Sequence, residues 1–121
     1  MSQRSVVAVI DDDLTVLDAT QTLLAAYGYD AELYASAEEF LSHASTTKAR
    51  CLIIDVNLGG SCGIEMANQL RSAGLSFPII FITGLNSPQV QRKALEAGCI
   101  GVLEKPCSGD ELIEALSALT K

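Results

Sequence analysis

Five short apolar runs recur along the chain, and a helix-like segment follows each of them. The runs are Val6–Ile10, Ala31–Ala35, Cys51–Ile54, Ile79–Ile82 and Ile100–Glu104. Runs of this length, separated by segments with helical spacing, predict β-strands that alternate with α-helices. Such a βα pattern forms a parallel sheet with helices on both faces, because the crossover connections are right-handed. No repeat or linker divides the 121 residues, so we expect one domain over residues 1–121.

The composition of the runs predicts their places in the sheet. The first, third and fourth runs are almost wholly apolar, as buried parallel strands are. The second run contains Glu32 and Tyr34, and the fifth is weakened by Gly101, so we place these two at opposite edges. The expected fold is therefore α/β, a flavodoxin-like doubly wound five-stranded parallel sheet of order 2-1-3-4-5 with five helices.

Local signals mark the helix ends. Capping-box or serine–proline spacing predicts the starts of the second, fifth and fourth helices at Ser36 with Glu39, Ser108 with Glu111, and Ser87 with Pro88. The third helix is expected over 63–73. Gly28 and Gly74 stand where the first and third helices should end. The inward face of the first helix is predicted to hold Val16, Leu17, Thr20, Leu23, Leu24 and Tyr27.

Charge and composition narrow the function. Fifteen acidic and eight basic residues give a net charge of −7, without a basic patch for nucleic acid. No apolar run is long enough for a bilayer, and no secretory signal opens the chain, so we expect a soluble, cytoplasmic domain. The four cysteines lack Cys-x-x-Cys spacing and have only His43 as a histidine companion. We interpret them as reduced structural thiols, against the alternative of a zinc or redox site.

Polar residues follow four of the five runs directly. They are Asp11, Asp12 and Asp13 after the first run, Asp55 after the third, Thr83 after the fourth and Lys105 after the fifth. The carboxyl ends of parallel strands converge where the strand order reverses, so these separate residues should form one pocket. Each residue alone has an ordinary structural interpretation, and for Asp13 we favour a cap of the following helix.

The chemistry of such a pocket points to phosphoryl transfer. Crowded carboxylates recruit a cation, and Mg²⁺ accepts one or two protein carboxylates, here Asp12 and Asp55 directly with Asp11 through water. Lys105 offers a mobile positive charge and Thr83 a hydroxyl for phosphoryl oxygens. Asp55 would be the nucleophile, since aspartate forms acyl phosphates.

The sequence resembles the receiver domains of two-component response regulators along its whole length. The resemblance rests on Ile-Asp-Asp-Asp at 10–13, Ile-Ile-Asp-Val-Asn-Leu-Gly-Gly from 53, Phe-Ile-Thr-Gly from 81 and Leu-Glu-Lys-Pro from 103. It implies Asp55 as phosphoacceptor, Asp11 and Asp12 as acidic metal-site residues, and Asn57 as a metal ligand through its main-chain carbonyl, with Mg²⁺ or alternatively Mn²⁺. Thr83 and Lys105 are implied as phosphate contacts.

The Phe-Ile-Thr-Gly and Glu-Lys-Pro motifs are similar to those of the nitrogen-fixation regulator branch. Members of that branch usually carry an additional LuxR-type DNA-binding domain. The resemblance implies a sensor histidine kinase or phosphotransfer protein as partner. Thr83 lies just before helix four and Lys105 just after strand five, so we expect the output surface, or a homodimer interface formed on phosphorylation, on helix four, strand five and helix five. We expect no enzyme activity beyond the domain's own phosphorylation and dephosphorylation. A cis Lys105–Pro106 peptide is expected as well.

Three positions depart from the family pattern. Gly59 replaces a common proline, which puts the stiffness of that loop in question. Val102 replaces the usual aromatic switch residue, and a valine cannot swing as an aromatic ring does. We therefore expect phosphorylation to shift the backbone of 84–88, where Gly84 permits unusual dihedrals. Leu85 is apolar and would shield an acyl phosphate from water.

Other functions stay open at this point. The run Asp11-Asp12-Asp13-Leu14-Thr15 also fits the Asp-x-Asp-x-Thr motif of haloacid-dehalogenase-type phosphatases, with Asp11 as nucleophile. Against that motif, no late acidic pair or cap insertion is present, and Asp55 would have no role. A module that binds partners without phosphorylation should have lost one of the site residues, and this chain retains all of them. A further alternative is that the chain is a domain cut from a longer regulator.

Overall fold

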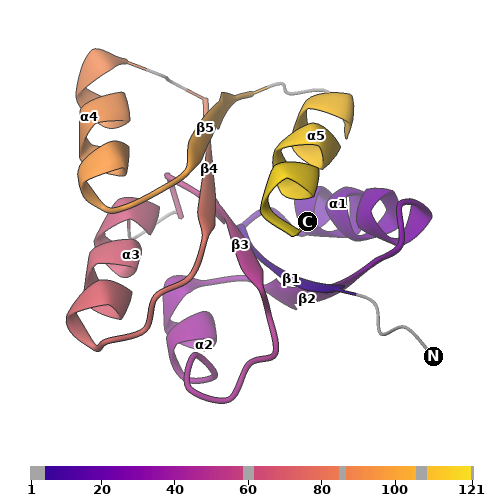
Figure 1. Ribbon diagram of the computed structural model, residues 1–121, viewed down its shortest axis with the longest axis horizontal. Helices are drawn as coiled ribbons and strands as arrows, with labels where there is room; N and C mark the ends of the chain where they lie inside the picture. Colours follow the sequence, from indigo (N-terminus) through magenta and orange to yellow (C-terminus); the bar gives the residue numbers. More distant parts are fainter. Residues whose placement is uncertain (1–4, 59–61, 85–86, 106–108, 121) are drawn as a thin grey trace.

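A computed structural model of the chain describes residues 5–58, 62–84, 87–105 and 109–120 (Figure 1). It contains a five-stranded parallel sheet of order β2-β1-β3-β4-β5. The strands are β1 (Ser5–Ile10), β2 (Tyr29–Tyr34), β3 (Cys51–Asp55), β4 (Ile79–Thr83) and β5 (Gly101–Glu104). The helices are α1 (Leu14–Ala26), α2 (Ala37–Leu41), α3 (Gly63–Ser72), α4 (Pro88–Glu96) and α5 (Gly109–Thr120). The predicted fold class and strand order are confirmed.

The sheet is buried on both faces, which explains why its central strands are apolar throughout. Along β3, Leu52 and Ile54 pack into one core, and Cys51 and Ile53 pack into the other. Successive side chains of a strand point to opposite faces, so an unbroken apolar run is what two cores require. Helices α2, α3 and α4 cover the first core and α1 and α5 the second (Figure 1).

The edge strands differ slightly from the sequence expectation. Strand β2 covers Tyr29–Tyr34 rather than 31–35, and β5 begins at Gly101 rather than at Ile100. Ile100 is half exposed although it is apolar. An apolar residue at a strand end does not show by itself whether the ladder has already begun, so these ends are the weakest part of the prediction.

Most helix-end predictions are confirmed. The Ser36 and Ser87 hydroxyls accept hydrogen bonds from the amides of Glu39 and Val90, as N-caps do. Gly28 and Gly74 follow α1 and α3 with φ of 88° and 80°, the left-handed conformation that ends a helix without strain. The Ser108–Glu111 cap falls partly outside the described residues.

The inward placement of Tyr27 is wrong. Tyr27 is the C-cap of α1, with φ −105° and ψ 12°, and it is 52% exposed. Once the backbone leaves helical geometry, the side chain no longer follows the apolar stripe set by Leu17 and Leu24. The 3.6-residue period therefore predicted one position too many.

No helix in the described part of the chain is both long enough and apolar enough to cross a lipid bilayer. Among the described cysteines, Cys51, Cys62 and Cys99 are free thiols. Cys51 is fully buried, and burial raises the pKa of its thiol to about 12, which keeps it protonated and unreactive. This supports the structural interpretation of Cys51.

Candidate functional site

Four of the predicted site residues lie at the carboxyl edge of the sheet because each ends or follows a strand. Asp11 follows β1, Asp55 ends β3, Thr83 ends β4 and Lys105 follows β5. The strand register keeps these ends level, with Asp55 opposite Ile82 and Thr83 opposite Glu104. The Lys105 amide also donates to the Thr83 carbonyl at 2.8 Å, which extends the ladder by one bond. The regular sheet thus brings together residues that are far apart in sequence.

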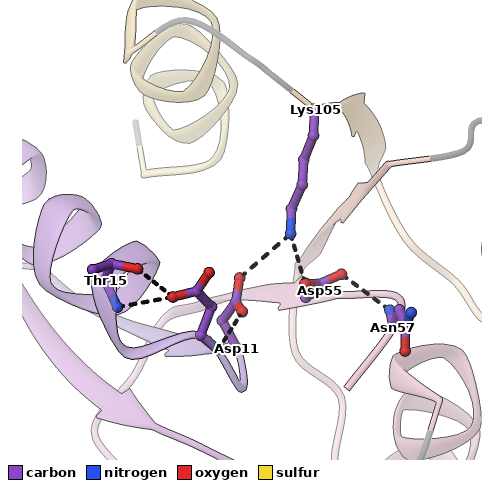
Figure 2. A network of polar contacts seen from close by, with 6 residues as sticks. Asp11, Thr15, Asp55, Asn57 and Lys105 are labelled. Atoms are coloured by element: carbon purple, nitrogen blue, oxygen red, sulfur yellow. Dashed lines mark hydrogen bonds and ion pairs between the residues drawn. The ribbon is translucent and has the colours of Figure 1, made fainter. Parts of the chain in front are cut away.

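Lys105 is the cation at the centre of this edge. Its Nζ lies 2.7 Å from Oδ2 of Asp55 and 3.8 Å from Oδ2 of Asp11. Figure 2 shows the lysine side chain reaching between the two aspartates. Both carboxylates are buried, whereas the Lys105 side chain is 36% exposed. The charged end of the lysine therefore enters the site from the solvent side.

Main-chain amides hold the two buried aspartates in place. Oδ1 of Asp55 accepts a hydrogen bond from the amide of Asn57 at 3.0 Å, as Figure 2 shows. Oδ1 of Asp11 accepts one from the amide of Asp13 at 2.9 Å. In both cases the donor is two residues further along the chain, so a tight local turn fixes the carboxylate. One oxygen of each carboxylate is thereby used for orientation, and the other faces Lys105.

The electrostatics show a surplus of negative charge. Burial raises the pKa of Asp11, the Asp13 amide lowers it, and the nearby Asp55 charge raises it further. The net direction is upward despite the attraction of Lys105. Burial alone would lower the pKa of Lys105, but its hydrogen bond to Asp55 and its attraction to Asp55, Asp11 and Asp12 together raise that pKa. One ammonium group does not fully compensate the crowded carboxylates, so the site favours additional positive charge.

The donor set fits a small hard cation. Carboxylate oxygens of Asp11, Asp12 and Asp55 all lie within 4.8 Å of one another. Asp12 is exposed, which leaves one side of the cluster open to water and to a ligand. Oxygen ligands with room for water are what Mg²⁺ requires. An open cleft of about 300 Å³ contains these groups and is lined by Asp11, Asp12, Asp13, Asp55, Asn57, Gly84 and Lys105.

Asp13 lines the cleft but has a structural role. It is the N-cap of α1, and its Oδ1 accepts hydrogen bonds from the amide of Thr15, at 3.0 Å, and from the Thr15 hydroxyl. These bonds, the hydroxyl first, lower the pKa of Asp13. The predicted capping role is confirmed.

The residues that were expected to carry the switch lie only partly within the described residues. Thr83 is buried at the end of β4, directly before Gly84, which lines the cleft. Val102 is half buried and packs against the core beneath α2, α3 and α4. Among the described glycines, positive φ occurs at Gly28, Gly74 and Gly98 but not at Gly84. Gly84 therefore does not use the left-handed region in this structure.

Several predictions fall outside the described residues. They concern Gly59, Leu85, the Lys105–Pro106 peptide, Cys107 and Ser108. One neighbour of the site was missed. Gly63 was expected only to begin the third helix, and the structure puts it against the main chain of Asp55. Glycine has a low helix propensity, so its presence at the start of this helix was the one sign in the sequence of a close contact there.

Comparisons with known proteins give a consistent result. A family model described as "Response regulator receiver domain" matches residues 7–117. The response regulator protein TodT of Pseudomonas putida is 36% identical over 122 residues, which cover 100% of this chain and 54% of TodT. The transcriptional regulatory protein FixJ of Bradyrhizobium diazoefficiens is 30% identical over 112 residues, 93% of this chain and 55% of FixJ. The chain thus spans about half the length of the curated relatives it matches.

Solved structures agree in fold. A response regulator receiver protein from Burkholderia phymatum superposes with a TM-score of 0.83 at 38% identity, covering 96% of this chain and 94% of that chain. The chemotaxis protein CheY4 of Vibrio cholerae gives a TM-score of 0.90 at 25% identity, covering 97% and 99%. Both similarities extend over nearly the full length of the chains compared.

Proposed function

The chain belongs to the response regulator receiver domain family of two-component systems, and we propose that Asp55 is the residue on which it accepts a phosphoryl group. The observation that carries the proposal is the placement of the Lys105 ammonium 2.7 Å from Oδ2 of Asp55, beside the carboxylates of Asp11 and Asp12. In this arrangement one open cleft would provide the nucleophile, a cation and the acidic ligands of a metal ion.

The proposed reaction is a direct displacement at phosphorus. A carboxylate oxygen of Asp55 forms the new P–O bond while the P–N bond of a kinase phosphohistidine breaks, and the imidazole leaves with the bonding electrons. The Asp12 and Asp55 carboxylates and the Asn57 carbonyl would hold Mg²⁺ or Mn²⁺, with Asp11 acting through water. The metal would neutralise charge on the phosphoryl oxygens. Lys105 and the Thr83 hydroxyl would contact the transferred group.

The proposed chemistry takes place only on the protein's own Asp55. We propose no turnover of a separate substrate, only phosphorylation and dephosphorylation of Asp55. The haloacid-dehalogenase alternative loses its support, because the receiver family match extends over residues 7–117 and Asp13 is held as a helix cap. The partner would be a sensor histidine kinase or a phosphotransfer protein, in the cytoplasm. Since the curated relatives are about twice as long, an output domain for transcription regulation is part of the proposal.

The output surface is proposed on α4, β5 and α5. Thr83 lies just before α4 and Lys105 just after β5, so contacts with a phosphoryl group act on both elements. Leu95 on α4 and Ile100 before β5 are exposed apolar side chains, 62% and 50% accessible. Exposed apolar groups of this kind suit a partner or a homodimer that forms on phosphorylation.

Mass spectrometry of the intact protein tests the proposal. Acetyl phosphate with Mg²⁺ should add one phosphoryl group to the wild type, and Asp55→Asn should add none. Asp13→Asn is the matched control, because it removes an acidic side chain from the same cleft while keeping a good N-cap. Stoichiometric phosphorylation of Asp55→Asn, or equal phosphorylation of the wild type in EDTA, would show that the assignment is wrong.

A further inference from the structure

Gly63 touches the main chain of Asp55. It is the first residue of α3, and a methyl group added to its Cα would overlap the carbonyl oxygen of Asp55 and lie 2.6 Å from Cγ2 of Ile54. Backbone atoms of a central buried strand cannot move aside as a flexible side chain does. The start of α3 therefore approaches the end of β3 more closely than any residue with a Cβ would allow.

The same contact closes the loop that carries Asn57. The Gly63 amide donates to the carbonyl of Val56 at 2.8 Å, and Asn57 forms an antiparallel bridge with Cys62. The Asn57 amide in turn donates to the Asp55 carboxylate at 3.0 Å. The Asp55 side chain and the Asn57 main chain are thus both attached to the junction between β3 and α3.

Other described glycines do not share this environment. A Cβ at Gly28, Gly74, Gly84 or Gly101 would meet nothing within 4 Å. At Gly109, the first residue of α5, a Cβ would lie 3.0 Å from Cδ1 of Leu23, the far end of a flexible side chain. Gly109 is therefore a matched control, since it also begins a helix and is also tightly packed but lies against no site main chain.

We propose that Gly63 is a positioning residue for the metal and phosphoryl site. By letting α3 rest on the Asp55 main chain, it fixes the Asp55 carboxylate and the Asn57 carbonyl relative to Asp11 and Asp12. This inference rests on the proposed function, because it assigns Gly63 to the same metal site. A methyl group at this position pushes the junction apart and moves two of the metal ligands.

The first experiment is an NMR titration of amide shifts with magnesium chloride alone. Gly63→Ala should weaken Mg²⁺ binding by about tenfold or more, the usual effect of disturbing groups that orient metal ligands. Gly109→Ala should bind Mg²⁺ with an affinity within about twofold of that of the wild type. The added methyl group should lower the unfolding midpoint of both variants. Equal Mg²⁺ affinity in folded Gly63→Ala and wild type would refute the proposal.

A second variant separates positioning from core packing. Ile54→Leu removes the Cγ2 methyl that a side chain at 63 would meet, but it leaves the Asp55 carbonyl in place. The double variant Ile54→Leu/Gly63→Ala should regain part of its stability and still bind Mg²⁺ weakly. Recovery of wild-type Mg²⁺ affinity would show that Gly63 acts only through the packing of Ile54.

A third measurement needs no variant, so it stands even if Gly63→Ala does not fold. Coupling between two sites is reciprocal. Mg²⁺ binding to the wild type should therefore slow hydrogen exchange of the Gly63 amide, which bonds to Val56. Unchanged exchange under saturating Mg²⁺ would overturn the inference. If the wild type does not bind Mg²⁺, the proposed metal site itself fails, and the two failures are thereby distinguished.

Discussion

The two halves of the site are packed very differently. All five residues of β3 are buried, and α3 buries Gly63, Ile64, Met66, Ala67 and Leu70. On the other side, β5 has three half-buried residues and one exposed, and Ala94 is the buried residue of α4. The half that holds Asp55 is therefore fixed by its core, and the half that supplies Lys105 is held by few apolar contacts.

This contrast suits a switch. Regions with few buried apolar contacts open and shift at low free energy, whereas a close-packed core transmits force without deforming. A phosphoryl group moves an equilibrium only through bonds that differ between the two states. Here those bonds would go to Thr83 and Lys105, which border the lightly packed half. We expect the packed half to keep its geometry when these bonds form.

The largest expected effect comes from truncating one residue in each half. Leu70→Ala should lower the free energy of unfolding by about 3 kcal/mol, because it leaves a cavity in a closed core. Val90→Ala on α4 should cost about 1 kcal/mol or less, since Val90 is half buried and alanine favours the helix. Urea unfolding measures both values, and similar costs would contradict the contrast.

Hydrogen exchange tests the same contrast without a mutation. Amides of β3 and α3 should exchange at least about tenfold more slowly than those of α4, which open locally. Beryllofluoride with Mg²⁺ should then change protection mainly between Thr83 and Leu103. A response confined to α1 and α2 would mean that the output face lies elsewhere.

Removing one surplus charge should stabilise the protein by a smaller amount. Asp11→Asn keeps the oxygen that accepts from the Asp13 amide, so in EDTA at neutral pH it should raise the free energy of unfolding by about 1 kcal/mol. The folded-state pKa of Asp11 lies above 3.8, its ordinary value. The charged form is thus disfavoured by folding, and the wild type loses stability as pH rises from 3.8 through the folded pKa.

The pH dependence provides the check on Asp11. The difference between Asp11→Asn and wild type should vanish below pH 3.8, where Asp11 is protonated in both states. Added Mg²⁺ should raise the unfolding midpoint of the wild type more than that of the variant, because ligand binding stabilises only the competent fold. A variant less stable than wild type in EDTA at pH 7 would show that Lys105 already compensates the buried charge.

The smallest expected effect concerns a bond between the two halves. The Arg71 guanidinium at the end of α3 donates to the Glu96 carbonyl at the end of α4, at 2.5 Å. Arg71→Met should cost about 0.5 kcal/mol, as exposed polar contacts do, and should speed exchange of the Gly98 and Cys99 amides. Lys93→Met, which removes a cation from the exposed face of α4, is the control and should leave both amides unchanged.

Most of the fold was predictable because it depends on local pattern. Apolar runs with helical segments between them predict a parallel sheet. In such a sheet the strand ends that carry Asp11, Asp55 and Lys105 lie at one edge. Tyr27 and Ile100 were placed wrongly because periodicity does not show where an element ends. The Gly63 contact was missed because it depends on how closely α3 approaches β3, which is a tertiary distance. The roles of Thr83, Asn57 and Lys105 toward phosphate and metal stay predictions.

The ion pair between Lys105 and Asp55 joins residues that are 50 positions apart in sequence. In a chain made from its N-terminus, β1 and β3 are complete long before the residues of β5 exist. Asp55 therefore lacks this counter-cation until Lys105 has been made and β5 pairs with β4. We therefore expect the site to be complete only late in folding. The rate at which refolding protein becomes able to bind beryllofluoride would measure when β5 pairs with β4.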